Sequence, residues 1–329
     1  MSLLIKILLF LIIIQLVLVF IDLLKASYKY FLIKELDLSK RYGNNTWVVI
    51  TGASSGQGRD MALAFAKRNF NILMIGSKRT DETAKEIQSL HPHIKTKIIY
   101  KDFRKAFENN FFDDIQLEFD KLNTDIALLI NNVGYRVGWK PYHEMPDKYI
   151  RDTIATGTIV QSKLTHMVIP FFLQRKQKGL KSGLINITAQ CMHSNFLFGI
   201  NNGNEISVPF LSVYEASNAF GFYHSNSIYK EYKNDFDILN ITPGAVITPN
   251  TKCLSDTIFS IDSKTFVNNI IKMIGNVNGY SCAYWGHAFS TFLINFVPFI
   301  KDKILYDVGR KIATDFENKE KVNNKSYDV

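Results

Sequence analysis

Short runs of apolar residues alternate with longer stretches of helical spacing along most of this 329-residue chain. The short runs are almost continuously apolar, which is typical of strands covered by helices on both faces. Strands are expected at 47–51, 72–76, 96–100, 126–131, 184–188, 238–242 and 280–285. Helices are expected notably at 59–68, 81–89, 148–176, 214–232 and 264–274. The alternation predicts an α/β fold built on a doubly wound parallel sheet.

The first apolar stretch differs from the others, because it runs from Leu3 to Leu24 and only Lys6, Gln15 and Asp22 interrupt it. About 20 apolar residues are enough to cross a bilayer as a helix. We therefore interpret the segment as an uncleaved membrane anchor. A cleaved signal peptide is the alternative, but the run is long and lacks a good small-residue cleavage site. Three lysines follow it closely, so the positive-inside rule keeps the rest of the chain on the cytosolic or matrix side.

The apolar pattern also divides the chain into segments. We expect a membrane anchor at 1–25, a linker at 26–45, a single folded domain at 46–282 and a polar tail at 317–329. Between the domain and the tail, residues 283–316 are rich in phenylalanine but too short in their apolar part to span a bilayer. We interpret this stretch as a membrane-associated segment that lies in the interface or packs on the domain.

Composition narrows the classes of function only slightly. The chain is 47% hydrophobic and 21% charged, as in an ordinary folded protein, and its net charge is +9. A basic balance suits an anionic membrane surface or a phosphate-bearing ligand, although a lysine-rich solvated surface gives the same number. No motif points to nucleic acid. The three cysteines and seven histidines have no metal-ligand spacing, so no metal site is expected.

A glycine-rich loop, TGASSGQG at 51–58, joins the first expected strand to a helix. Glycines at such a turn let the backbone approach a pyrophosphate, and the helix N-terminus attracts its charge. The second strand ends at Gly76 and is followed by Ser77, Lys78 and Arg79, without the acidic residue that would hold the ribose of NAD. This favours NADP(H); the alternative is that Lys78 and Arg79 are exposed turn residues.

These features, with Asn131-Asn132-Val133-Gly134 after the fourth strand and Tyr214 at the start of a helix, resemble the short-chain dehydrogenase/reductase family. The branch most similar is that of the membrane-bound very-long-chain 3-oxoacyl-CoA reductases and 17-beta-hydroxysteroid dehydrogenases. The anchor, Lys101-Asp102-Phe103 and the stretch 266–280 carry this likeness, which extends from Met1 to Lys311. It implies a Rossmann-type fold and NADPH-dependent ketone reduction at the endoplasmic reticulum; a mitochondrial membrane is the alternative, because such anchors carry no address.

The resemblance also assigns cofactor contacts to positions of this chain. Asp102 matches the family's adenine-contacting acid, and 243–248 matches its loop beside the nicotinamide. Gln57 stands where the family has an aliphatic residue. The candidate cofactor-binding residues are Gly52, Ser54, Gly56, Gln57, Gly58, Lys78, Arg79, Asp102, Asn131, Val133, Gly134, Tyr214, Pro243, Gly244, Val246 and Thr248.

The family's catalytic tetrad is Asn, Ser, Tyr and Lys, and only Tyr214 is present here. Gly157, Ala189 and Asn218 stand at the positions of Asn, Ser and Lys. The family's lysine binds the nicotinamide ribose and stabilises the phenolate form of the tyrosine. A positive charge about 4–5 Å from the phenolate is worth roughly 3–4 kcal/mol at an effective dielectric near 20. The family's serine holds the carbonyl oxygen, and losing one such donor costs about 10²–10³ in rate. The chemistry is therefore expected to be weakened or lost.

The stretch from Ala189 to Tyr214 is about twice the family's usual length. It could supply replacement groups from Thr188, Gln190, His193 or Ser194, or be an exposed loop or partner contact. The leading hypothesis is a membrane-anchored, NADP(H)-binding protein that is catalytically weakened or inactive and serves as an accessory or structural subunit of a membrane complex, or as a homodimer. The alternative is an active ketoreductase for a lipid-like ketone, either a very-long-chain 3-oxoacyl-CoA or a steroid.

Overall fold

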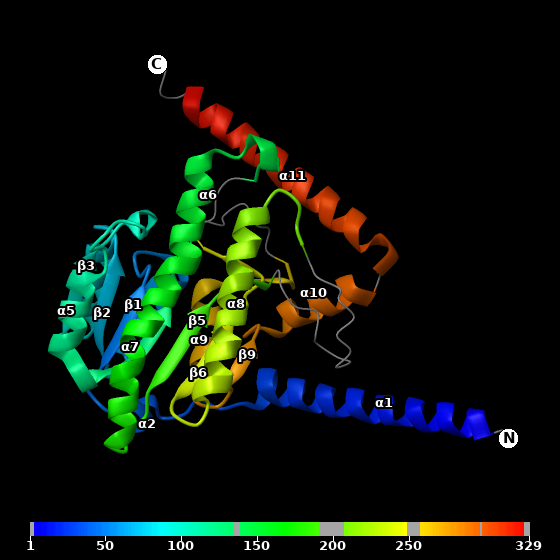
Figure 1. Ribbon diagram of the computed structural model, residues 1–329, viewed down its shortest axis with the longest axis horizontal. Coiled ribbons are helices and arrows are strands. Elements are labelled where there is room, and N and C mark those ends of the chain that lie inside the picture. Colours follow the sequence, from blue (N-terminus) through cyan, green and yellow to red (C-terminus); the bar gives the residue numbers. More distant parts are fainter. Residues whose placement is uncertain (1–2, 135–138, 191–206, 249–256, 297, 326–329) are drawn as a thin grey trace.

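A computed structural model describes residues 3–134, 139–190, 207–248, 257–296 and 298–325 (Figure 1). Within this part of the chain, seven parallel strands form one sheet in the order β3-β2-β1-β4-β5-β6-β9. They are β1 Trp47–Thr51, β2 Asn71–Gly76, β3 Thr96–Tyr100, β4 Ile126–Asn131, β5 Gly183–Ile187, β6 Asp237–Ile241 and β9 Gly279–Ser281. Two short strands, β7 Ala245–Ile247 and β8 Ser260–Asp262, pair separately. The predicted doubly wound parallel sheet is confirmed.

Helices cover both faces of the sheet, as its continuously apolar strands require (Figure 1). One face packs against α3 Gly56–Ala66, α4 Thr80–Leu90 and α9 Ser263–Met273, and the other packs against α5 Asp113–Leu122 and α7 Val160–Gln177 together with α8 Ser212–Tyr232. The remaining helices are α1 Leu3–Ser27, α2 Leu38–Tyr42, α6 Asp147–Ile154, α10 Trp285–Phe296 and α11 Pro298–Lys325. Short turns of 3-10 helix are η2 Phe103–Lys105, η3 Asn123–Asp125 and η4 Tyr142–Glu144, and the π-helical turns are η1 Tyr28–Leu32 and η5 Ala155–Ile159.

Two predicted elements differ from the observed ones. The strand expected at 280–285 ends at Ser281, because Ala283 has a φ angle of 54° and Trp285 already begins α10. The single helix expected at 148–176 is interrupted by η5, where the hydroxyls of Thr156 and Thr158 accompany a widened turn by donating to the carbonyls of Asp152 and Ile154.

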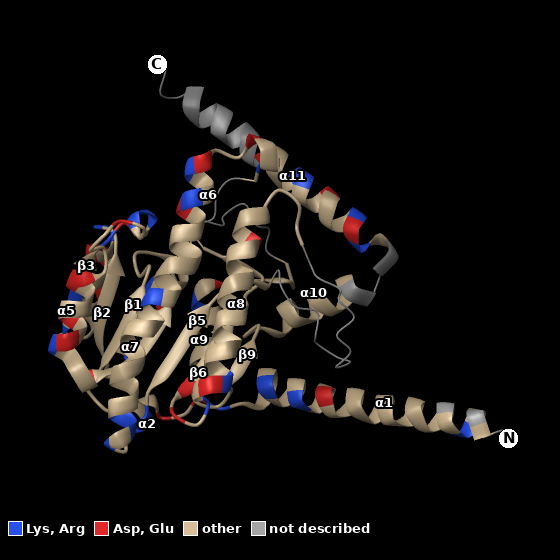
Figure 2. Ribbon diagram, viewed as in Figure 1, with Lys and Arg blue, Asp and Glu red and all other residues tan. Residues whose placement is uncertain are grey.

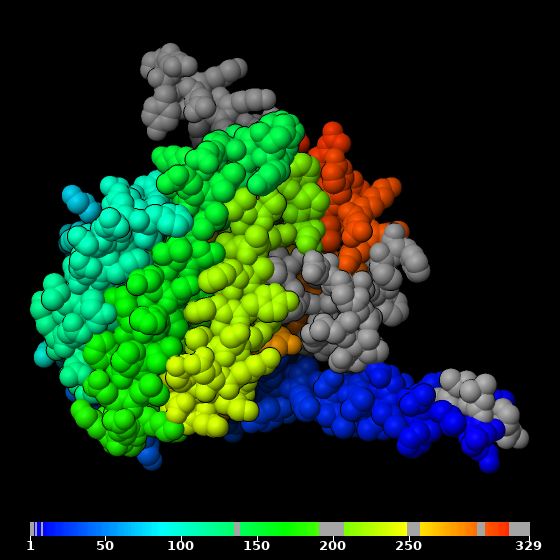
Figure 3. Space-filling view, viewed as in Figure 1, coloured from blue at the N-terminus to red at the C-terminus, as the bar shows by residue number. Residues whose placement is uncertain are grey.

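The N-terminal helix α1 projects away from the domain (Figures 1 and 3). Its apolar residues are exposed, and the segment Ile5–Leu32 is long and apolar enough to cross a membrane by length and composition. Figure 2 shows its charges only near its two ends. These properties fit association with a membrane.

The segment after α1, expected to be part of a linker at 26–45, is docked on the domain. Arg68 forms an ion pair with Glu35 at 2.5 Å, and Asn276 donates to the carbonyl oxygen of Lys34 at 2.8 Å. Leu38 and Tyr42 are buried in the core. The folded domain therefore begins before residue 46, because α2 contributes apolar side chains to the core. The composition of 26–45 did not distinguish this docked segment from a linker.

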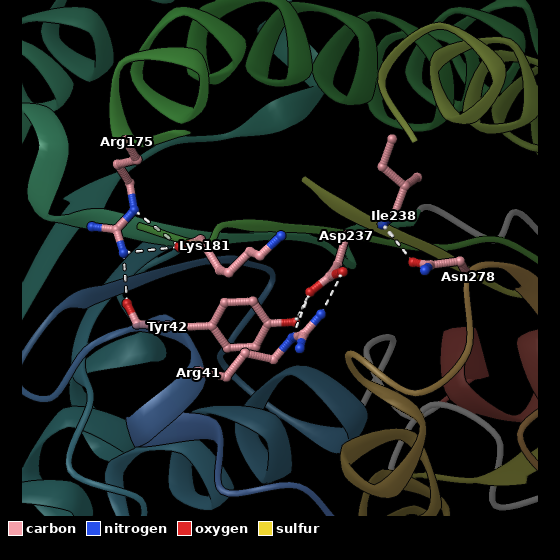
Figure 4. A network of polar contacts seen from close by, with 7 residues as sticks. All are labelled: Arg41, Tyr42, Arg175, Lys181, Asp237, Ile238 and Asn278. Carbon is pink, nitrogen blue, oxygen red and sulfur yellow. Dashed lines mark hydrogen bonds and ion pairs between the residues drawn. The ribbon is translucent and has the colours of Figure 1, made fainter. Parts of the chain in front are cut away.

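A network of polar contacts holds α2 against the sheet (Figure 4). Arg41 binds both carboxylate oxygens of Asp237 at 2.8 and 2.9 Å, and the Tyr42 hydroxyl donates to the same carboxylate at 2.6 Å. The buried guanidinium of Arg175 donates to the carbonyl oxygens of Tyr42 and Lys181. Burial lowers the pKa of Arg175, and it raises the pKa of Tyr42, to which Asp237 also contributes.

At the other end of the chain, α10 and α11 follow the sheet as two consecutive helices. The α11 helix continues to Lys325, although a polar tail was expected from 317. The residues after 316 are indeed polar, but Glu317 and Lys321 stand four positions apart, a spacing that favours helix. The change in polarity at this boundary is therefore not the end of the helix.

Candidate functional site

The glycine-rich loop turns sharply between β1 and α3 at the carboxyl end of the sheet. Gly52 and Gly56 have φ angles of 70° and 54°, which L side chains rarely adopt. A Cβ atom on Gly58 would overlap the carbonyl oxygen of Gly52 and lie 2.6 Å from Asn132 Nδ2. The loop therefore depends on its glycines, and it leaves the N-terminus of α3 facing the carboxyl edge of the sheet, where an anion would be stabilised.

Asn132 closes this loop onto the end of β4, a role that the sequence did not single out. Its Nδ2 donates to the carbonyl oxygens of Thr51 at 3.0 Å and Gly52 at 3.4 Å. The Thr51 hydroxyl oxygen accepts from the backbone N–H groups of Asn132 at 2.9 Å and Val133 at 3.0 Å. Val133 and Gly134 thus follow directly from a fixed point beside the glycine loop.

The side chain of Asn131 lies on the other face of β4, away from the loop. Its Nδ2 donates to Thr165 Oγ1 at 3.1 Å and to Asn186 Oδ1 at 2.8 Å, both in the buried layer under α7. Successive residues of a strand point to opposite faces of the sheet. This alternation already indicated that only one of Asn131 and Asn132 could face the loop. Asn131 was a candidate cofactor residue, and its side chain belongs instead to this internal network.

Charged residues gather at the edge formed by the ends of β2 and β3 (Figure 2). Lys78 and Arg79 are exposed just before α4 and form no ion pair among the described residues. The carboxylate of Asp102 accepts from Arg104 Nε at 2.8 Å and Nη2 at 2.6 Å. The Arg104 guanidinium lowers the pKa of Asp102. Arg104 is therefore a further basic residue at this edge that the sequence analysis did not name.

The loop at 243–248 is held by α10 through His287. The Gly244 N–H donates to His287 Nδ1 at 3.1 Å, so Nε2 carries the ring hydrogen and donates to the Ala245 carbonyl oxygen at 3.1 Å. Burial lowers the pKa of His287, and the bond to Ala245 raises it to a lesser extent. Gln190 Nε2 donates to the His287 carbonyl oxygen and to Thr291 Oγ1. The sequence analysis did not identify the role of His287 in holding this loop. The available signal was a single histidine within the otherwise mostly apolar run that forms α10.

The same loop approaches the glycine-rich loop at its far end. A Cβ atom on Gly56 would lie 3.2 Å from Thr248 Cβ, so the two loops are in contact there. The backbone N–H of Gln190 donates to the Pro243 carbonyl oxygen at 2.8 Å, and Val246 is buried in β7. The structure thus brings 52–58, 132–134 and 243–248 together around the carboxyl ends of β1, β4 and β6.

Tyr214 lies in the first turn of α8 and is half-buried. It packs against a small apolar cluster formed by Trp139, Leu211 and Ala313, with Ile312 beside it. The last two residues belong to α11, which lies against the N-terminal part of α8 in the space-filling view (Figure 3). The α11 helix therefore covers one side of Tyr214, the residue that we matched to the family's catalytic tyrosine.

Asn218 and Ala189 supply neither a charge nor a hydroxyl. Asn218 Nδ2 donates to the Tyr214 carbonyl oxygen at 2.8 Å, one turn earlier in the same helix. Ala189 is 7% exposed, and the neighbouring Thr188 hydroxyl lies 3.2 Å from Asn240 Oδ1. With Gln190 bound to α10, two of the suggested replacement groups already have partners. His193 and Ser194, the other two, lie outside the described residues.

Gly157 lies in the π-helical turn η5 and is packed tightly against α8. A Cβ atom there would be 2.8 Å from Ser217 Oγ and 2.9 Å from Ser217 Cβ. The Ser217 hydroxyl in turn donates to the Tyr214 carbonyl oxygen at 2.7 Å. The η5 turn and α8 are thus in tight contact at Gly157, the residue that we matched to the family's asparagine.

Gly157→Asn is expected to lower the free energy of unfolding by about 1–3 kcal/mol, because the new side chain overpacks the contact with Ser217. Urea unfolding of the detergent-solubilised full chain measures the change. Adding Ser217→Gly should recover part of the loss, since it removes both atoms that the new Cβ would meet. Equal stability of wild type and Gly157→Asn would contradict the packing described here.

A separate apolar groove of about 470 Å³ opens between α6 and the start of α8. Its lining residues include Ile150, Ile154, Val213 and Ala216, but neither Tyr214 nor the glycine-rich loop. Among the described residues, no group of His, Cys, Asp and Glu could hold a metal ion. Since no residue of the glycine-rich loop or of the loop at 243–248 lines the groove, the groove is distinct from both loops.

The sequence profile of the short chain dehydrogenase family matches residues 46–258, well over half of the chain. The chain belongs to this family. Its relatives include very-long-chain 3-oxoacyl-CoA reductases of Coccidioides immitis, 27% identical over 80% of this chain and 73% of that protein, and of Bos taurus, 28% identical over 84% of each. The predicted family is confirmed, and these relatives carry the name of one of the two enzyme groups in the predicted branch.

Solved structures support the same fold. A short-chain dehydrogenase from Sphingobium yanoikuyae in complex with NADPH covers 72% of this chain and 87% of its own, with a TM-score of 0.58 and 18% identity. A 7beta-hydroxysteroid dehydrogenase covers 78% of this chain and 93% of its own, with a TM-score of 0.65 and 18% identity. Both share the doubly wound sheet with this family member.

Proposed function

We propose that this protein is a membrane-anchored short-chain dehydrogenase that binds NADP(H) and has lost most or all of its catalytic activity. The observation that carries the proposal is at position 218. There the family's lysine is replaced by an uncharged amide that is bound to the Tyr214 carbonyl oxygen at 2.8 Å. Position 157 adds to it, since Gly157 is packed so closely on Ser217 that an asparagine would not fit without movement.

The residues present fit a dinucleotide. The glycine-rich loop forms a cradle that a Cβ atom on Gly58 would fill, and it stands at the N-terminus of α3, where a pyrophosphate is stabilised. The Oε1 atom of Gln57 is buried without a hydrogen-bond partner within the described part of the chain, so a bound nucleotide could supply one. Lys78 and Arg79 would face a 2′-phosphate, and the loop at 243–248 would lie along the nicotinamide.

NADPH, when bound, supplies a hydride for the reduction of a carbonyl. Tyr214 would donate the proton to the carbonyl oxygen, while Asn218 can offer a hydrogen bond but no charge to stabilise the phenolate. The names of the relatives and the retained Tyr214 favour a second candidate, an active NADPH-dependent ketoreductase for very-long-chain 3-oxoacyl-CoA or another lipid-like ketone. In the leading proposal the protein is an accessory or structural subunit at the endoplasmic reticulum membrane.

Replacing both Lys78 and Arg79 by alanine is expected to weaken NADPH binding about 10–100-fold, since a hydrogen bond to a charged group contributes about 1.5–3 kcal/mol. NADH binding should change little, because NADH lacks the 2′-phosphate. Fluorescence titration of both nucleotides against the full chain measures this, with the exposed Lys85→Ala on α4 as the matched control. Tighter binding of NADH than NADPH by the wild type would overturn the cofactor assignment.

A further inference from the structure

The helix α10 has one buried face and one exposed apolar face. His287, Ala288 and Thr291 are buried against the domain. On the opposite side, Trp285, Phe289 and Leu293 stand four residues apart and are 37%, 39% and 40% exposed. The buried face already has its partners in the domain, so the exposed stripe is not part of the core.

The exposed stripe continues onto the turn that ends the N-terminal helix. Phe31 in η1 is 66% exposed, and its ring lies 6.5 Å from that of Trp285. The Trp285 ring lies 6.4 Å from Phe289, so the aromatic contacts run from one element to the other. We define the aromatic patch as Tyr28, Phe31, Leu32, Trp285, Phe289 and Leu293.

The position of the patch indicates what covers it. It begins where α1, long and apolar enough to span a bilayer, meets the domain, and α10 itself carries no charged residue (Figure 2). Lys25 and Lys34 flank this junction and suit anionic headgroups. Tryptophan and tyrosine are favoured at the level of the headgroups, where an apolar ring and a polar edge are both satisfied.

We propose that the aromatic patch lies in the interfacial layer of the same bilayer that α1 crosses, so that the protein has two membrane contacts far apart in sequence. The proposal goes beyond the proposed function: it uses the anchor but neither cofactor binding nor the loss of catalysis. One consequence is that the helix lying on the lipid also holds Gly244 through His287. The loop at 243–248 is therefore separated from the bilayer by the thickness of a single helix.

Tryptophan fluorescence of the full chain in liposomes tests the proposal, with lipids that carry a quencher just below the headgroups. Trp285 is exposed, whereas Trp47 and Trp139 are 6% and 8% exposed. We expect the quencher to reduce the emission of the wild type and Trp285→Phe to abolish most of that quenching. Trp47→Phe should keep it. Unquenched emission in a protein that floats with the liposomes, or equal quenching in wild type and Trp285→Phe, would overturn the proposal.

A second variant tests the rest of the patch without touching the fluorophore. Phe289→Glu should reduce the quenching of Trp285, because a carboxylate on the exposed stripe opposes insertion into the interface. Leu117→Glu is the matched control, since Leu117 is 60% exposed on α5, at the far side of the sheet in Figure 1. A protein that does not float with the liposomes overturns both the anchor and the patch, while NADPH titration reports on the proposed function separately.

Discussion

Wild-type protein is expected to reduce a long-chain 3-oxoacyl-CoA at least about 10³-fold more slowly than an intact relative, because the oxyanion donor and the charge beside the tyrosine are both missing. The positions concerned are Ala189, which is buried, and Asn218, whose amide is bound to its own helix. NADPH oxidation in liposomes or detergent measures the rate. Turnover comparable with that of the relative, abolished by Tyr214→Phe, would show instead that the protein is an active ketoreductase.

The double variant Ala189→Ser and Asn218→Lys is expected to raise the rate about 10²-fold over wild type, since a nearby charge alone is worth roughly 3–4 kcal/mol. Gly157 is left unchanged, because an asparagine there would collide with Ser217. Asn218→Met combined with Ala189→Ser is the matched control, which adds length without charge. Equal rates for the lysine and methionine variants would mean that the missing charge does not limit catalysis.

Arg175→Met is expected to lower the free energy of unfolding by about 3–5 kcal/mol, because it leaves several buried acceptors unpaired. The guanidinium donates to the Ser182 hydroxyl at 3.0 Å and to the carbonyl oxygens of Tyr42, Thr124 and Lys181. No single apolar side chain can replace these bonds. Urea unfolding of the full chain in detergent measures the change.

The next residue along α7 provides the control for this prediction. Lys176 pairs with Asp235 on the surface, where ion pairs contribute about 0–1 kcal/mol, so Lys176→Met should cost at most that amount. A loss in Arg175→Met no larger than in Lys176→Met would contradict the role assigned to the buried guanidinium.

The sheet was predictable because its determinants are local. The runs at 47–51 and 126–131 match β1 and β4 at both ends, since burial on two faces leaves a nearly continuous apolar signal. The run at 96–100 also matches β3, although this edge strand is only partly buried and contains Lys97. The last strand was predicted too long, because nothing in its apolar pattern shows that Ala283 has a positive φ angle. The glycine-rich loop was recognisable because each glycine meets a local steric limit.

The rest of the site depends on contacts between distant parts of the chain. His287 reaches Gly244 across 43 positions, and Asn132 reaches Thr51 across 81. Such contacts appear only once the sheet has assembled. The α11 contact with Tyr214 had a weaker signal: Lys301, Leu305 and Ala313 are buried at helical spacing, which the polar residues between them obscure.

If α1 crosses a membrane as we propose, the docked junction between α1 and α2 limits how the domain moves relative to the lipid. A domain on a flexible linker can take many orientations and many distances from the membrane surface. Here the ion pair of Glu35 with Arg68 and the bonds of Arg41 to Asp237 close the tether onto the body of the protein. With α1 in a bilayer, the proposed cofactor site would be held at one height and one tilt above the lipid, and its encounters with other molecules would depend on their density in the plane of the membrane.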